Sequence, residues 1–295
     1  MKIGYPCINN TLKCTTNSTF RLASYSEENL KLKIENNLKC LKKVLEFNKE
    51  NNIEFFRISS DLIPFASHEI NQFNWQEHFK KELQEIGDFI KENNFRISMH
   101  PDQFVLINSP NKEIVKRSID ELNYHCEVLE AMHLDNSAKV QIHVGGIYNN
   151  KPEAMQRFIE NYNKLPEKIK KRLCIENDDR LFSLKDCLQI HKTTQIPIIF
   201  DFFHHECLNN KEPTSEAVKL ASQTWKKQDG ILMADYSSQE KDERKGKHAE
   251  TIDLKDFQEK INQAKQNKNL DFDVMLEIKD KEKSAIKVIK ELINH

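Results

Sequence analysis

Short apolar runs rich in β-branched residues alternate along this chain with longer segments whose apolar residues recur at helical spacing. Eight runs have the length and composition of buried strands, at residues 2–5, 53–59, 95–99, 140–144, 173–176, 197–201, 231–235 and 274–278. The segments between them place apolar residues on one face, as Leu38, Leu41 and Leu45 do. This alternation predicts parallel βα units.

The length of the chain suits one closed barrel of such units. It has 295 residues, and a (β/α)₈ barrel typically needs about 250. Only 6 glycines occur, and no Gly/Ser linker, low-complexity tract or close repeat marks a domain boundary. We therefore predict a single α/β domain over residues 1–295, a TIM barrel. An open doubly wound sheet is the alternative that the same alternation would permit.

Potential metal ligands stand at the downstream ends of six of the runs, in the segments FRISMH, KVQIHV, LCIEN, PIIFDFFH, ILMADYS and VMLEIK. Because the C-terminal ends of parallel barrel strands converge on one face, these side chains would meet in one cup. Buried carboxylates and imidazoles need partners, and shared cations satisfy several of them at once. We predict a metal cluster there, with ligands His100, His143, Glu176, Asp201, His204, Asp235 and Glu277.

The number of candidates indicates more than one ion. His68 and His248, in loops after two strands, bring the total to nine, although solvated loop histidines are an equal interpretation. One catalytic ion takes three or four protein ligands, so nine suit two or three ions. Nitrogen and oxygen donors favour Mn²⁺, Zn²⁺, Fe²⁺ or Co²⁺ over a thiolate site. Of the other histidines, His205 fits either role and four in helical stretches are interpreted as structural: His78, His125, His133 and His191.

A cluster of this kind suits phosphate esters, because one ion supplies hydroxide while another stabilises the departing oxygen. Phosphodiester hydrolysis is therefore the leading hypothesis. The 45 basic and 46 acidic residues leave a net charge of −1, so no whole-molecule field attracts a polyanion, although bound cations would make the cup less negative. Locally, the segment KDERKGK at residues 241–247 could bind phosphate groups through Arg244, Lys245 and Lys247, or be only a solvated loop.

Cysteine usage and the N-terminus predict a cytoplasmic protein. Seven cysteines lie scattered with no CxxC pair, at positions 7, 14, 40, 126, 174, 187 and 207. This spacing fits neither a disulfide framework nor a zinc knuckle, so we interpret them as reduced cytosolic thiols. The start MKIGYPCIN lacks a signal-type apolar region, and no run approaches the roughly 20 apolar residues that span a membrane. We expect no membrane partner.

A set of motifs in order along nearly the whole chain resembles the UV damage endonuclease family. The motifs are IGYPCIN, TFRL, HPDQFVLINS, IHVGG, IENDD, DFFHH, DYSSQ, GKHAE and MLEIKDKE. The resemblance implies a (β/α)₈ barrel whose metal cluster, usually of manganese, nicks double-stranded DNA on the 5′ side of a UV photoproduct, leaving a 3′-hydroxyl and a 5′-phosphate for excision repair. Zn²⁺, Co²⁺ or Mg²⁺ are alternative ions. It implies metal ligands at His68, His100, His143, Glu176, Asp201, His204, His248 and Glu277.

The chain departs from the family pattern on the seventh predicted strand. Met233 and Asp235 stand where many members have a lysine, sometimes carboxylated, and a histidine. Methionine cannot form a carbamate. Asp235 can still ligate through an anionic oxygen, so we keep it as a predicted ligand, with the affinity and identity of a third ion open.

The resemblance also implies residues that contact damaged DNA. Gln103 is retained from a Gln-Tyr pair that probes the gap left by an extruded lesion, whereas Phe104 replaces the tyrosine. Phenylalanine keeps the apolar wedge and lacks only the hydroxyl, so the role is expected to survive. Tyr5 and Asn9 match positions that the family uses near the damaged strand, with loop packing as the alternative.

These expectations define a mechanism. A hydroxide held between ions would attack the phosphorus in line while another ion stabilises the leaving 3′-oxygen. Glu176 and Glu277 are the candidates to bridge ions or orient the attacking water. Lys279 would point to the same side as Glu277 and contact a phosphate oxygen, with a structural ion pair as the equal alternative. Because a lesion would reach the site from one open face of the barrel, a single chain is sufficient, and we expect a monomer.

Two other functions compete. A metal-dependent sugar isomerase or epimerase on the same barrel would use fewer ligands and leave the HPDQF and GKHAE segments idle. A damage-binding protein without catalysis would not need so complete a ligand set. Metal stoichiometry and incision of damaged DNA distinguish the three.

Overall fold

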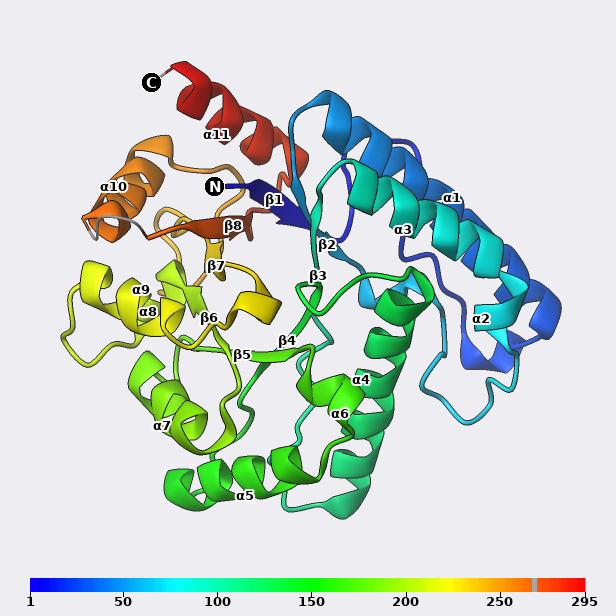
Figure 1. The fold of residues 1–295 in the computed structure, drawn as a ribbon, viewed down its shortest axis with the longest axis horizontal. Coiled ribbons are helices and arrows are strands. Elements are labelled where there is room, and N and C mark those ends of the chain that lie inside the picture. The colour runs from blue at the N-terminus through cyan, green and yellow to red at the C-terminus, as the bar shows by residue number, and fades with distance from the viewer. Residues whose placement is uncertain (267–269, 295) are drawn as a thin grey trace.

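Eight parallel strands close into a barrel in residues 1–266 and 270–294, which the computed structural model describes (Figure 1). Each strand pairs with its neighbour in the chain, and β8 pairs with β1. The predicted TIM barrel is confirmed, and the open-sheet alternative is wrong. The strands are β1 (Ile3–Pro6), β2 (Phe55–Ile58), β3 (Arg96–Met99), β4 (Lys139–His143), β5 (Leu173–Glu176), β6 (Ile198–Asp201), β7 (Leu232–Tyr236) and β8 (Phe272–Leu276).

Helices surround the barrel and cover its outer face (Figure 1). Three short 3₁₀ turns, Leu22–Ser24, Ser60–Leu62 and Lys227–Asp229, also lie in the described part of the chain. The helices are α1 (Glu27–Glu50), α2 (Trp75–His78), α3 (Lys80–Glu92), α4 (Lys112–Ala131), α5 (Lys151–Lys164), α6 (Glu167–Lys170), α7 (Leu184–Thr194), α8 (Phe202–Cys207), α9 (Thr214–Ser222), α10 (Leu254–Lys265) and α11 (Glu282–Asn294).

Local sequence signals set where the long helices begin. Ser26, Asn111 and Asp253 each cap a helix, because each side chain accepts a hydrogen bond from a backbone N–H of the first turn. The helix after Ser26 buries Leu30 and Ile34, among others, against the barrel. Among the described residues, no helix is both long enough and apolar enough to cross a membrane.

A buried polar network closes the N-terminal end of the barrel. Lys139 bonds to Asp229 and donates to the carbonyl of Lys171 at 2.9 Å. Arg96 donates to the carbonyl of Asp229 at 2.9 Å. Both cations lie over the Trp225 ring, with the Arg96 guanidinium 5.6 Å from its centroid. Because these charges satisfy one another, the closed end is stable and the open end at the strand C-termini is left for a site.

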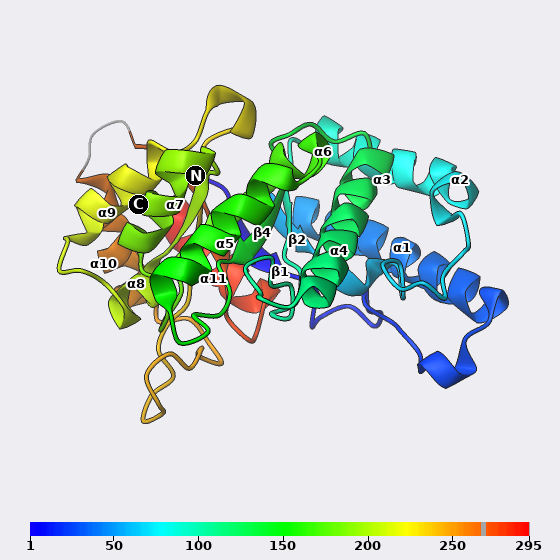
Figure 2. The ribbon, with the colours of Figure 1, turned by 90° about the horizontal axis from the view of Figure 1, so that it is seen from below.

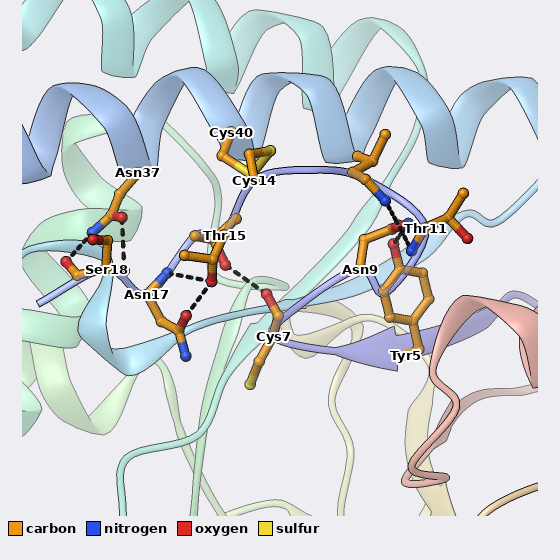
Figure 3. The surroundings of a disulfide bond; sticks show 12 residues. Tyr5, Cys7, Asn9, Thr11, Cys14, Thr15, Asn17, Ser18, Asn37 and Cys40 are labelled. Carbon is orange, nitrogen blue, oxygen red and sulfur yellow. Dashed lines mark hydrogen bonds between the residues drawn. A yellow bond between two sulfur atoms is a disulfide. The ribbon is translucent and has the colours of Figure 1, made fainter.

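A disulfide joins Cys14 to Cys40 and ties the loop after β1 to α1 (Figure 3). Asn37 strengthens the attachment, since its side chain exchanges hydrogen bonds with the backbone of Ser18 at 2.9 and 3.1 Å. The interpretation of all seven cysteines as free thiols is therefore wrong for this pair. Its members are 26 residues apart, so no short spacing marks them, and only the path of the loop brings them together.

Thiol titration tests the disulfide. In denaturant without reductant we expect five reactive thiols per chain, because Cys7, Cys126, Cys174, Cys187 and Cys207 are free, and seven after reduction. A C14S/C40S variant should give five in both states. Seven thiols before reduction would show that the bond does not form.

The closed end of the barrel supplies a stability prediction. Lys139→Met would leave the buried Asp229 carboxylate without its cation, and should lower the free energy of unfolding by roughly 3–5 kcal/mol. Lys164→Met, at an exposed position of α5, should change it by less than about 0.5 kcal/mol. Urea unfolding followed by circular dichroism measures both. Equal stability of the two variants would contradict the role of the network.

Candidate metal centre

Two groups of potential metal ligands meet at Glu176, the last residue of β5, within the part of the chain that the structure describes. His100, His143 and Glu176 form one group, and Glu176, Asp201 and His204 form the other. The Oε2 atom of Glu176 lies 3.6 Å from Nε2 of His100 and 3.9 Å from Nε2 of His143. Its Oε1 atom lies 2.9 Å from Nδ1 of His204. A carboxylate with one oxygen in each group could contribute to two ion sites.

Strand register and a tight strand-to-helix turn position these groups. His143 and Glu176 are directly paired across β4 and β5. The chain turns from β6 into α8 at Asp201, whose side chain accepts a hydrogen bond from the backbone N–H of His204 at 2.7 Å. The cap at Asp201 therefore fixes His204 beside it, with their Oδ2 and Nδ1 atoms 3.3 Å apart.

Burial and neighbouring charges shift the pKa values of these groups in opposite directions. Burial alone would raise the pKa of Glu176, but His143, His100 and His204 hold it well below its usual range. Burial, together with Glu176 and other carboxylates, raises the pKa of Asp201 despite His204. Burial would lower the pKa of His204, but Asp201 and Glu176 raise it to about 12. The Asp201 and His204 pair therefore retains a proton at neutral pH.

The donor set fits divalent ions. Asp201 Oδ2 and His143 Nδ1 are buried without a hydrogen-bond partner among the described residues, although buried polar atoms are nearly always paired. A cation beside Asp201 would satisfy its orphan oxygen. His100 Nδ1 lies 2.8 Å from the carbonyl oxygen of Pro101, and a proton on Nδ1 would leave Nε2 free to ligate. Imidazole and carboxylate donors suit Mn²⁺, Zn²⁺ or Co²⁺.

The opposite side of the cup is held by Arg57, a buried residue of β2. Its guanidinium donates to Asp235 at 2.8 Å, to Gln141 at 2.9 Å, and to Glu277. Burial would raise the pKa of Glu277, but Arg57 lowers it to about 2. Burial raises the pKa of Asp235 to about 7, although Arg57 opposes the shift. Asp235 and Glu277 thus reach the cup as predicted, but each is bound to a cation of the chain itself.

Arg57 and Gln141 are functional-site residues that we did not single out from the sequence. The available signal was a charged or amide side chain inside an otherwise apolar strand, in FFRI and KVQIH. Gln141 also stands two residues before His143, so both side chains point to the same side of β4.

The two loop histidines predicted as ligands differ in position. His248 lies at the edge of the cup, where its ring centroid is 6.2 Å from that of His204 and its Nδ1 is 2.8 Å from the carbonyl oxygen of Glu277. His68 is exposed, and its Nδ1 accepts a hydrogen bond from the backbone of Ile70 at 3.1 Å. Neither belongs to the two groups around Glu176 among the described residues.

Gln103 and Phe104 stand exposed beside the cup. Phe104 has 62% of its surface accessible, which is unusual for so large an apolar side chain. The pair lines a pocket of about 580 Å³ that also includes Arg57, His100 and Glu277. A second pocket, of about 520 Å³, lies between Gln103 and the loop that follows β4. An exposed aromatic ring at the edge of such a pocket is suited to insertion into a base stack.

Tyr5 and Asn9 are both buried beside the cup. Tyr5 lies within β1 and has no exposed surface. Its hydroxyl donates to Asn48 at 2.7 Å. The same hydroxyl accepts from the side chain of Asn9 at 2.8 Å (Figure 3). These contacts are those of the packing alternative, in which both residues support the loop that carries the disulfide, and contact with a damaged strand stays a prediction.

The basic residues predicted to bind phosphate lie on the open side of the barrel. The segment between β7 and α10 projects from that side (Figure 2). Lys279 pairs with Glu250 at 2.7 Å and Lys247 with Glu243 at 2.5 Å, which supports the ion-pair alternative for Lys279. Exposed ion pairs of this kind are weak because water screens them, so a phosphate could replace the carboxylate. Arg244 and Lys245 are exposed as well.

Distant structural relatives share only the fold. Endonuclease IV from Thermus thermophilus superposes with a TM-score of 0.61 at 11% identity, over 100% of this chain and 98% of the other. D-Psicose 3-epimerase from Clostridium cellulolyticum superposes with a TM-score of 0.54 at 14% identity, over 86% of each chain. The same barrel therefore supports both chemistries, and the fold by itself does not separate the competing functions.

More similar proteins belong to the family that the sequence motifs resemble. The UV DNA damage endonuclease of Clostridium perfringens is 42% identical over 294 residues, 99% of this chain and 71% of the relative. That of Bacillus cereus strain G9842 is 35% identical over 95% of this chain and 89% of the relative. The crystal structure of SacUVDE is 48% identical with a TM-score of 0.94, over 100% of this chain and 98% of the other. The family model UV-endonuclease UvdE matches residues 1–295, so the chain belongs to this family of UV DNA damage endonucleases.

Proposed function

We propose that this endonuclease nicks the damaged strand of double-stranded DNA immediately 5′ to a UV photoproduct, and that the reaction requires divalent metal ions. The observation that carries the proposal is Glu176, whose two oxygens face two separate groups of ligands. One group would hold an ion through His100 and His143, and the other through Asp201 and His204. The relatives named UV DNA damage endonuclease supply the substrate class.

Mn²⁺ is the proposed ion, with Zn²⁺, Co²⁺ and Mg²⁺ as alternatives. Two ions at such a centre supply a nucleophile by lowering the pKa of water and stabilise the departing 3′-oxygen. The residues of the chain contribute fixed geometry, since Glu176 reaches the cup from a rigid strand end. Arg57 holds Glu277 in one orientation, and Glu277 would accept a hydrogen bond from the attacking water. His68 stays a predicted outer ligand that would require its loop to move inward.

Selection of damage would rest on the mechanics of the duplex. A photoproduct weakens pairing and stacking, so bending and extrusion cost less there than in intact DNA. Phe104 would enter the gap as an apolar wedge, and Gln103 would contact the exposed base edge opposite. Arg244, Lys245 and Lys247 would hold the phosphate backbone, which makes binding weaken with salt. One chain exposes all of these groups on one face, so a monomer suffices.

A sugar isomerase or epimerase of the same barrel is the alternative. It would need one or two ions and a proton shuttle, and would leave the HPDQF segment with its exposed Phe104 without a role. This exposed side chain favours the nuclease. Damage binding without catalysis would not require Glu176 to face two ligand groups.

Incision of a defined substrate tests the proposal. A 5′-labelled duplex with one cyclobutane dimer should yield a single product that ends just 5′ to the dimer, only with Mn²⁺ and only on damaged DNA. Metal-stripped enzyme and an undamaged duplex are the controls. Failure of folded enzyme to cut with Mn²⁺, Co²⁺, Zn²⁺ or Mg²⁺ would leave the isomerase and the binding-only function as the better explanations.

Glu176→Gln tests the bridging carboxylate. The substitution keeps the shape but removes the anionic oxygen, so single-turnover incision should fall by more than about a hundredfold, the upper end of the loss when an outer-shell partner of a metal ligand is removed. Glu259→Gln, at an exposed position of α10, should leave the rate unchanged. Circular dichroism verifies folding. A Glu176→Gln enzyme that cuts at the normal rate would contradict the assignment.

The proton retained by Asp201 and His204 predicts a pH dependence of ion binding. The raised pKa values of both groups mean that an ion must displace a proton, so affinity should rise as pH increases. If each bound ion displaces one proton, the dissociation constant for Mn²⁺ should fall roughly tenfold per pH unit between pH 6 and 8. Calorimetry in buffers of different ionisation enthalpy counts the released protons. A dissociation constant independent of pH would show that the pair is already deprotonated.

A further inference from the structure

We propose that Arg57 limits the centre to two ions, by taking the place of a third cation and holding Asp235 as its counterion rather than as a metal ligand. This inference rests on the proposed function, in which the other side of the cup binds the two ions bridged by Glu176. It assigns Asp235 and Glu277 to a positioning network built around a cation that the chain carries permanently.

The guanidinium of Arg57 spans the side of the cup that the two ligand groups leave free. It donates to Asp235 at 2.8 Å through Nη2 and to Glu277 through Nη1. These carboxylates come from β7 and from the residue after β8, whereas the ligand groups come from the residue after β3, from β4 and β5, and from the β6–α8 turn. The barrel therefore divides its carboxylates into one set for ions and one set for Arg57.

Gln141 joins the two halves. Its side-chain oxygen accepts from Arg57 at 2.9 Å, and its amide nitrogen donates to both Asp235 and Glu176. Asp235 Oδ2 therefore receives hydrogen bonds from Arg57 and Gln141 together. An ion could bind that oxygen only if both donors were displaced.

Charge favours the guanidinium over an additional ion. Asp235 is 1% exposed on its side chain and Arg57 4%, and separating such a buried pair leaves an uncompensated charge, which is strongly unfavourable. Arg57 is always protonated, so its charge does not depend on metal supply. A divalent cation beside the same carboxylates would also face this fixed positive charge at close range.

Met233 gives β7 an apolar side chain where the resemblance leads one to expect a lysine. It is 1% exposed and packs in the barrel interior with Phe55, Cys174, Ile199 and Met275. This apolar layer lies between Arg57 and the charged network at the closed end of the barrel. With methionine at this position, β7 offers this side of the cup only the carboxylate of Asp235, whose Oδ2 atom already accepts from Arg57 and Gln141.

Counting ions tests the inference. The protein is saturated with Mn²⁺, passed through gel filtration and analysed by plasma mass spectrometry. We expect two ions per chain in the unmodified enzyme and two in Asp235→Asn, because the carboxylate of Asp235 ligates no ion. Three ions in the unmodified enzyme, or one fewer ion in Asp235→Asn, would overturn the role of Arg57.

Removing the guanidinium should change the count. In Arg57→Met the freed carboxylates of Asp235 and Glu277 should take up a third Mn²⁺, whereas Arg57→Lys and the double variant R57M/D235N should return to two. Arg117→Met, at an exposed position of α4, is the matched control and should hold two. A folded Arg57→Met protein with only two ions would overturn the claim that Arg57 sets the number.

The two proposals fail in different ways. If Arg57→Met does not fold, the ion counts of the unmodified enzyme and of Asp235→Asn still test the inference, because Asp235→Asn is a conservative substitution. A count of none or one in folded enzyme would overturn the bridged pair, and with it both proposals. A count of three with normal incision would overturn the inference on Arg57 alone.

Discussion

Four carboxylates crowded into one end of a narrow barrel are the constraint on which the site depends. Glu176, Asp201, Asp235 and Glu277 all lie on the C-terminal side of the strands, and three of them are almost fully buried. Like charges at this proximity raise one another's pKa values unless cations separate them. The structure separates them with histidines around Glu176 and with a guanidinium around Asp235 and Glu277, so the cup has two electrostatically different halves.

The rest of the fold holds this arrangement in place. Strands β4 and β5 have only five and four residues. The register of the sheet therefore sets the position of a candidate ligand at the end of each strand. The closed end is fixed by Lys139, Arg96 and their partners, which satisfy their charges internally. Close-packed apolar side chains such as Met233 separate the two polar layers.

The surface around the cup combines a few exposed side chains with a rigid support. A net charge of −1 provides no general attraction for DNA, so the proposed recognition depends on local groups: Phe104 where a duplex can be deformed, and Arg244 at the phosphate backbone. Tyr5 and Asn9 lie beneath this surface and support the loop that the Cys14–Cys40 disulfide attaches to α1.

The barrel, the order of its strands and the candidate metal ligands at their ends could be predicted from the sequence, because apolar periodicity and polar residues at strand ends are local properties. The family motifs added the reaction. Only the folded chain reveals how the charges are partnered: Arg57 meets Asp235 across 178 residues of chain and Glu277 across 220, and Cys14 meets Cys40 only through the path of a loop. The same is true of the inward position of Tyr5 and the exposure of Phe104. Such pairings depend on which elements become neighbours when the barrel closes, and no local pattern encodes that.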